Sequence, residues 1–336
     1  MATAHPDGEG RPLSRQVPGQ ERFQSLELPL DRLDAAVSDG GSRPDMGMPH
    51  DIGIVDTMIG FPHRDLKELY RFITRQTKDA ESKEQFDSPV EYMFKDVPDK
   101  RLAGSDDPIG VTLREMDLWG VEKGLIGVGD AEGVGAKAVA RHPDRFIPST
   151  TADPNHGMKG ISRLVSEYET YGIRAVGVFP AGTFPQVPIN DKKMYPLYAK
   201  CVELHIPVFC CAGIPGPRLK AACQHVELID EVMFDFPDLV FVTRHGCEPW
   251  TDLAVKLMVK WPNLYYSTSA FAPKYYPADI IEFANTRGAD KVIYAGYFPM
   301  GLSLERIAKE LPLVGFKDEV WPKFLRTNAL RVLGIA

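Results

Sequence analysis

Short apolar segments alternate with longer amphipathic segments along most of this chain. The amphipathic segments, such as residues 157–172 and 248–262, have the spacing of helices. The apolar segments are rich in β-branched side chains and have the continuous apolar character of strands that are buried on both faces. They occupy residues 52–59, 123–129, 145–152, 173–179, 206–212, 239–245, 264–270 and 291–297. The pattern therefore predicts eight parallel strands that are connected by helices.

Eight strand–helix units in one continuous series favour a closed (β/α)8 TIM barrel over an open, doubly wound sheet. A nucleotide-binding sheet would carry a glycine-rich turn after its first strand. Neither GxGxxG at that place nor GxxxxGK[ST] anywhere occurs in this chain. The predicted fold class is accordingly α/β, in the form of a TIM barrel.

Two segments lie outside the repeat. Residues 1–48 are rich in Gly, Pro, Ser, Arg and Asp, which predicts an extended N-terminal arm before a single barrel domain over 49–336. Residues 61–120 form a long insertion after strand one, with a helix predicted at about 64–75 and another that ends near Trp119. An insertion at this place lies on the active-site face of a barrel. It would serve there as a lid or a subunit contact, unless it is a surface excursion without a role.

Composition narrows the possible functions. The 336 residues include 39 Lys and Arg against 46 Asp and Glu, so the net charge is 39 − 46 = −7. This acidity argues against non-specific binding to nucleic acid or to anionic membranes. No apolar run reaches the roughly 18 residues of a membrane span, and the N-terminus has no apolar signal core. Five cysteines without a CxxC predict reduced thiols and a cytoplasmic protein.

Reactive side chains stand where predicted strands end. In a barrel, catalytic groups come from the carboxyl ends of different strands. Strand one carries Asp56 and strand five carries Cys211. Strand six ends at His245, which Gly246 follows, and strand eight ends at Tyr297. His245 is a candidate general acid or base, and Cys211 is either a nucleophile or an inert buried thiol.

Six segments together resemble a known family, the amidohydrolase-related TIM barrels, which include aminocarboxymuconate-semialdehyde and resorcylate-type decarboxylases. The resemblance covers residues 50–336 approximately and implies the same barrel, a small-molecule substrate and a homo-oligomer. The segments are IVDTMIGFP, IPVFCCAGIPGP, VTRHGCEPW, LMVKWPNLYYSTSA, VIYAGYFPMG and FLRTNALRVLGI.

The resemblance also implies that the usual metal site is altered. Family members hold one divalent metal, such as Zn²⁺ or Mn²⁺, through a His-x-His on strand one, a His on strand five and an Asp on strand eight. The matching positions here are Met58, Gly60, Cys211 and Tyr297. These residues do not supply imidazole and carboxylate ligands, so we expect neither a metal nor another cofactor. A non-standard site made from His63, Cys211, His245 and Cys247 is the alternative.

The same resemblance assigns roles around the barrel mouth. His245 matches the strand-six histidine that acts as general acid or base, and the Tyr297 hydroxyl would replace the metal as electrophile or simply fill its space. Asp56 would orient partners or pair with a neighbouring strand. Arg244 alternates with His245, so it is expected to point toward the helices and to form a structural ion pair. The residues expected to contact substrate are Met58, Phe61, Phe179, Glu248, Trp250 and Phe298.

These observations predict an amidohydrolase-related, metal-independent enzyme. It would act on a small carboxylated or aromatic compound, by hydrolysis or by C–C cleavage such as decarboxylation. One alternative is a catalytically retired barrel that serves as a binding or structural protein. The other alternative is a metallohydrolase with non-standard ligands.

Overall fold

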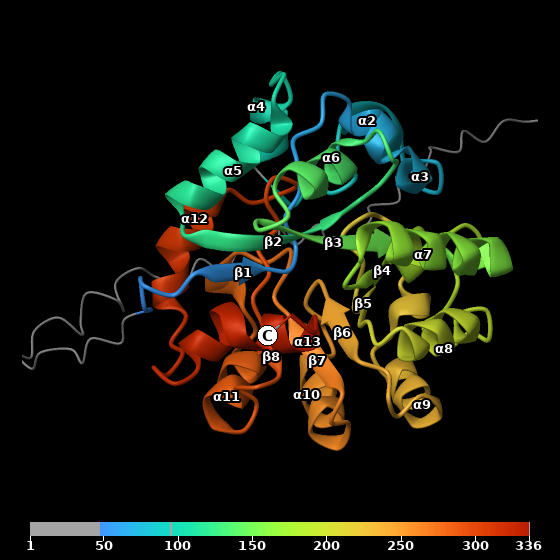
Figure 1. Ribbon diagram of the computed structural model, residues 1–336. Helices are drawn as coiled ribbons and strands as arrows, with labels where there is room; N and C mark the ends of the chain where they lie inside the picture. The colour runs from blue at the N-terminus through green and yellow to red at the C-terminus, as the bar shows by residue number, and fades with distance from the viewer. Residues whose placement is uncertain (1–47, 95, 336) are drawn as a thin grey trace, which may run out of the picture. The chain divides into compact units, whose positions relative to one another are not determined.

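The computed structural model describes residues 48–94 and 96–335, and these form a (β/α)8 TIM barrel (Figure 1). Eight strands pair in parallel and in chain order. Each predicted apolar segment overlaps one of them, so the predicted fold is confirmed. The strands are β1 (Ile54–Asp56), β2 (Val121–Gly127), β3 (Phe146–Thr151), β4 (Val176–Val178), β5 (Val208–Cys211), β6 (Phe241–Arg244), β7 (Leu264–Ser267) and β8 (Val292–Ile293).

The first and last strands meet just beyond β1 and β8. The backbone N–H and the hydroxyl of Thr57 both donate to the carbonyl of Tyr294, and Gly60 N donates to Phe298 O at 2.8 Å. Ile59 and Phe298 form an isolated parallel bridge at the same seam. The ends of β1 and β8 are therefore neighbours, as in a closed barrel.

Helices lie around the strands (Figure 1). They begin or end close to the predicted boundaries, and Trp119 caps the carboxyl end of α5 as expected. Their apolar faces pack on the outward side chains of the strands, which include Phe146, Phe241 and Tyr266. The helices are α5 (Pro108–Leu118), α6 (Val134–Arg141), α7 (Gly157–Tyr171), α8 (Tyr195–Glu203), α9 (Leu228–Asp235), α10 (Thr251–Lys260), α11 (Ala278–Thr286) and α12 (Leu304–Glu310).

The amino-terminal end of the barrel is closed by α13 (Asn328–Val332), which lies across the strands in Figure 1. Ala329 and Val332 of this helix pack against the inward side chains of the strands, such as Val55 and Phe209. The amide of Asn328 donates to the carbonyl of Val292 at 2.8 Å. Because this end is plugged, a ligand can approach the inward side chains only from the carboxyl ends of the strands.

The insertion after β1 contains α2 (Leu66–Leu69), α3 (Arg71–Thr74), a π-helical turn (Glu81–Gln85) and α4 (Pro98–Leu102). The prediction of one helix over 64–75 was wrong, because Tyr70 leaves helical geometry between α2 and α3. Burial raises the pKa of the Tyr70 hydroxyl, and Tyr297 and Asp99 act in the same direction.

The predicted N-terminal arm, residues 1–48, lies outside the described residues except for Met48. Across the part of the chain that the structure describes, no helix combines the length and the apolar character needed to cross a bilayer.

Candidate active site at the barrel mouth

His245 and Tyr297 are neighbours at the carboxyl ends of β6 and β8. His245 follows β6 directly and has a φ of 63°, in the left-handed region that residues other than glycine rarely adopt. Its imidazole lies edge-on to the Tyr297 ring, with 5.4 Å between the ring centroids. The structure thus brings together the two residues that the sequence assigned to acid–base and electrophilic roles.

Ser269, which follows β7, orients the imidazole. Its Oγ accepts a hydrogen bond from the backbone N–H of His245 at 3.2 Å and a weak one from Ser267 Oγ at 3.5 Å. With both lone pairs engaged, the Ser269 hydroxyl hydrogen is available to Nδ1 of His245, 3.1 Å away. In this hydrogen-bond arrangement Nδ1 of His245 is the acceptor, so the proton of the neutral ring lies on Nε2.

The imidazole is strongly held in its neutral form. Burial and the adjacent Arg244 charge lower the pKa of His245 to about 3, while the Ser269 contact opposes them. Burial also raises the pKa of the Tyr297 hydroxyl, with a further contribution from Cys211. At neutral pH both side chains can therefore act as hydrogen-bond donors.

Asp56 lies at the seam of the barrel, beneath the mouth. Its carboxyl is fully buried, and Oδ1 accepts from the backbone N–H groups of Met58 at 2.8 Å and Gly296 at 2.9 Å. Oδ2 has no hydrogen-bond partner. Burial raises the pKa of Asp56 to about 6. Its geometry is that of a buried group that holds the β1 and β8 ends together.

Cys211 is the last residue of β5 and is also buried. Burial raises the pKa of its thiol to about 12, although the Arg244 charge acts in the opposite direction. A thiol with this pKa is almost entirely protonated at neutral pH, and the thiolate is the nucleophilic form. The structure thus favours the inert thiol over the nucleophile.

Arg244 differs from the expectation. Its side chain points into the barrel, where its Cζ lies 4.8 Å from the Phe209 ring centroid and Nη2 donates to the Thr57 carbonyl at 3.3 Å. The prediction of an outward side chain in an ion pair was wrong. Strand alternation holds through β6, so Arg244 points inward like Val242, whereas the left-handed turn at His245 breaks the alternation and keeps His245 at the mouth as well.

A divalent metal does not fit the side chains at this mouth. Met58 and Cys211 offer a thioether and a protonated thiol where imidazoles would be needed. A guanidinium lies at the same level, since Arg244 is in register with Cys211, and it would repel a cation. Among the described residues, no three His, Cys, Asp or Glu side chains are grouped as a metal site. This includes the predicted alternative set of His63, Cys211, His245 and Cys247.

The expected substrate-contacting residues lie in different environments. Phe61 and Phe298 are buried in the core, where Phe61 packs on Phe146 at 5.4 Å between ring centroids. Trp250 packs against His225, with 4.0 Å between the rings. Phe179 lies against Gly182 in its own loop. Met58 and Glu248 remain partly exposed, and burial raises the pKa of Glu248.

The insertion covers part of the mouth. The Phe94 ring packs on Tyr297, with 5.9 Å between centroids. Asp99 of α4 is buried, its N–H donates to Pro299 O at 3.1 Å, and its Oδ1 accepts from the backbone N–H of His63 at 2.8 Å. Burial raises the pKa of Asp99 to about 6, and its Oδ2 has no partner. Phe94 and Asp99 were not predicted as site residues, since neither lies near a strand end in the sequence.

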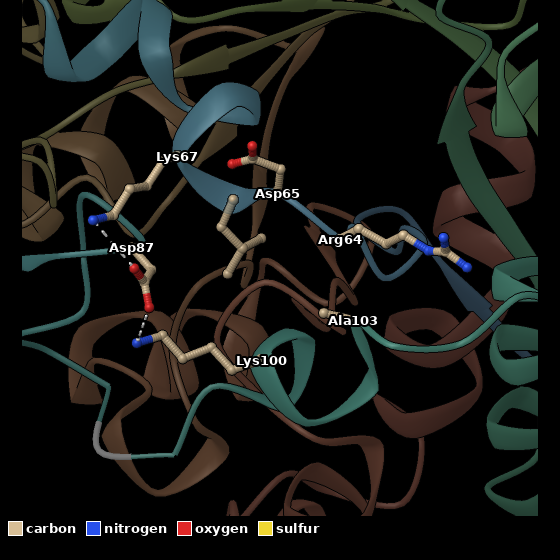
Figure 2. Close-up of a pocket in the computed structure, with 7 residues that line it drawn as sticks. Arg64, Asp65, Lys67, Asp87, Lys100 and Ala103 are labelled. Atoms are coloured by element: carbon tan, nitrogen blue, oxygen red, sulfur yellow. Dashed lines mark ion pairs between the residues drawn. The ribbon is translucent and has the colours of Figure 1, made fainter.

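Two cavities lie away from His245 and Arg244. One of about 320 Å³ is on the insertion, and Figure 2 shows its charged side chains. Lys100 pairs with Asp87 at 2.9 Å and Lys67 pairs with the same carboxylate at 3.6 Å, while Arg64 points away from them. The second, of about 130 Å³, lies between the β3–α7 connection and α8, and its lining includes Ala152, Met158 and Leu197. The lysines of the first cavity are paired with Asp87, and the second cavity is small. Neither cavity is therefore a better candidate for the active site than the barrel mouth around His245.

Comparison with known proteins gives three kinds of similarity. A model of the amidohydrolase family matches residues 130–335. A 2-keto-4-carboxy-3-hexenedioate hydratase from a Sphingobium species is 28% identical over 128 residues, which cover 33% of this chain and 38% of the hydratase. The chain thus matches less than two-fifths of that relative's length.

Solved structures share the fold. A TIM-barrel protein of Bordetella bronchiseptica, described as uncharacterized, has a TM-score of 0.62 and 23% identity over 84% of this chain and 98% of its own. A 5-carboxyvanillate decarboxylase of Novosphingobium aromaticivorans has a TM-score of 0.60 and 16% identity over 87% of this chain and 100% of its own. That decarboxylase was solved with manganese and 4-hydroxy-3-methoxy-5-nitrobenzoic acid.

Proposed function

This chain belongs to the amidohydrolase family, and we propose that it is an enzyme whose reaction takes place at the barrel mouth. The family membership agrees with the resemblance seen in the sequence. The observation that carries the proposal is the pair formed by His245 and Tyr297, a histidine oriented by a serine beside a protonated phenol. Such a pair supplies two neutral hydrogen-bond donors for negative charge that develops on the substrate.

The proposed substrate is a small carboxylated or aromatic compound, and the proposed reaction is hydrolysis or C–C cleavage such as decarboxylation. Support comes from the names of the similar proteins, which are a hydratase of a carboxylated keto acid and a decarboxylase of a carboxylated aromatic acid. The partly exposed ring of Tyr297 and the Phe94 ring above it would provide apolar contacts for such a compound.

In the proposed reaction His245 donates a hydrogen bond from Nε2, because Ser269 occupies Nδ1. The neutral ring donates this hydrogen bond to the reacting atom and keeps its proton. The Tyr297 hydroxyl stabilises negative charge that develops on a carbonyl or carboxylate oxygen. Asp56 and Cys211 are assigned no step, since the first is enclosed at the seam and the second is a protonated thiol.

We further propose that the reaction proceeds without a resident divalent metal, on the strength of the mismatched donor set described above. A homo-oligomer in the cytoplasm is also proposed. Five unpaired, buried cysteines support a reducing compartment. Exposed apolar side chains, among them Phe72, Met93 and Phe184, would provide contacts between copies.

The test is a screen of the purified full chain with carboxylated aromatic and unsaturated acids. Turnover is measured as release of CO2 or as a change in the ultraviolet spectrum of the acid. His245→Gln and Tyr297→Phe are each expected to lower kcat by about a hundredfold or more. The exposed His156→Gln serves as control for histidine loss. Turnover that His245→Gln leaves unchanged contradicts the proposal. Binding without any turnover would instead support a retired barrel.

A further inference from the structure

Arg244 carries a charge in the interior of the barrel. Its guanidinium stacks on Phe209 and reaches from β6 across to the carbonyl of Thr57 beyond β1. On β4 the facing residue is Gly177, where a Cβ would lie only 3.1 Å from Nη1. A glycine at this place therefore leaves room for the guanidinium, and larger side chains would crowd it.

No carboxylate of the described residues lies within ion-pair distance of this guanidinium. The structure gives its five N–H donors one hydrogen bond, to Thr57, and its Nε is buried without a partner. Arg244 is only partly exposed, and a charge withdrawn from water without a counter-charge is unfavourable. Burial lowers the pKa of Arg244, but an arginine stays charged throughout the physiological range. The unused donors therefore indicate an anionic partner that is not part of the chain.

The surroundings favour a carboxylate as that partner. Arginine presents a planar fork that matches the two oxygens of a carboxylate. Arg244 is the residue next to His245 and is in register with Cys211 on β5, so a bound anion would lie at the proposed reaction centre. Neutral His245 and the protonated Tyr297 hydroxyl would add donors and no negative charge.

We propose that the Arg244 guanidinium is the anion-binding group of the barrel mouth and that it holds the substrate by a carboxylate. It would supply a fixed positive charge at a mouth whose other side chains do not suit a metal ion. The inference rests on the proposed function, because it identifies the group of the substrate that the same site recognises.

The test measures binding, with benzoate as the probe and benzamide as its neutral counterpart, by calorimetry on the full chain. Wild-type protein is expected to prefer benzoate by at least about tenfold. Arg244→Met is expected to lose this preference, whereas Arg287→Met, at an exposed position on the end of α11, is expected to keep it. An Arg244→Met variant that still prefers benzoate overturns the proposal, and so does wild-type protein that binds benzoate more weakly than about 10 mM.

A second measurement needs no variant, in case Arg244→Met does not fold. In crystals of the wild-type chain with para-bromobenzoate, the anomalous signal of bromine locates the ring. The carboxylate is expected at about 3 Å from the Nη atoms of Arg244. A ring bound elsewhere contradicts the proposal.

These results separate the two proposals. Benzoate binding through Arg244 without turnover of any acid supports the anion site and contradicts the enzyme. Turnover that Arg244→Met leaves unchanged, in kcat and in KM, supports the enzyme and contradicts the anion site.

Discussion

At the scale of single residues, Asp56 illustrates how a buried carboxyl is tolerated. Oδ1 is satisfied by two backbone N–H groups, but Oδ2 is not satisfied. Gly296 is required beside it, because a Cβ there would lie 2.5 Å from Oδ2. The pKa of about 6 shows that the folded protein binds this proton more tightly than the unfolded chain does.

This pKa predicts a pH dependence of stability. Since the folded-state pKa is raised, the contribution of Asp56 is most favourable below pH 4 and is lost as the pH rises through 6. The free energy of unfolding of Asp56→Asn minus that of wild type should thus increase by about 2 kcal/mol over this range. Urea denaturation at several pH values measures it. The exposed Asp318→Asn controls for loss of one carboxylate, and parallel Asp56→Asn and wild-type curves would contradict the assignment.

The cysteines provide a second prediction at this scale. All five are buried, and burial raises the pKa of Cys211 and of Cys247 to about 12. Iodoacetamide at neutral pH should therefore modify none of them in the native protein and all of them in denaturant. Peptide mass spectrometry reads the result. Rapid modification of Cys211 alone in the native protein would show instead that its thiol is a reactive nucleophile.

At the scale of elements, the insertion is tied to the loop after β5. Arg218 of that loop lies over the Tyr92 ring at 4.9 Å and pairs with Asp79 at 2.6 Å and Glu81 at 2.7 Å. The Tyr92 hydroxyl donates to the carbonyl of Gly216 at 2.5 Å. These contacts hold the segment that carries Phe94 near the mouth.

Removal of this link should loosen the insertion and leave the barrel intact. Arg218→Ala is expected to accelerate amide exchange over residues 79–102 by about tenfold, with little change in the strands. Hydrogen–deuterium exchange with mass spectrometry resolves the two regions. Arg64→Ala, which removes an exposed ion pair with Asp106 elsewhere in the insertion, is the matched control and should not reproduce the effect. Equal exchange in Arg218→Ala and wild type would show that the link is not needed.

At the scale of the whole molecule, the fold does not depend on the side chains of a metal site. The barrel is that of proteins that hold manganese, yet the side chains at its mouth do not match a cation. Folding of the barrel depends on apolar packing between strands, helices and the α13 plug, and Tyr297, at one of the metal positions, itself packs against this core.

We therefore predict well below one Zn²⁺ or Mn²⁺ per chain in protein purified without chelators. Added Mn²⁺ should leave the Tm unchanged, because a ligand that does not bind the folded state cannot stabilise it. Elemental analysis and thermal denaturation test this. One metal per chain, together with a Tm that falls on chelation, would indicate a site with other ligands.

Much of this architecture was predictable from the sequence. Strands buried on both faces leave continuous apolar segments, and their alternation with amphipathic segments determines a parallel barrel and the side on which its strand ends lie. The positions of His245 and Tyr297 at the mouth follow from that periodicity and from the resemblance. These properties depend on residues close together in the sequence.

Only the tertiary structure decided what the mouth contains. The direction of Arg244 depends on a left-handed turn at His245 and on the space left by Gly177 of β4, far away in the sequence. The Phe94 contact with Tyr297 likewise joins the insertion to β8. Sequence periodicity specifies on which face of an element a residue lies, but the charge, space and cover around its side chain are set by elements that meet only in the folded chain.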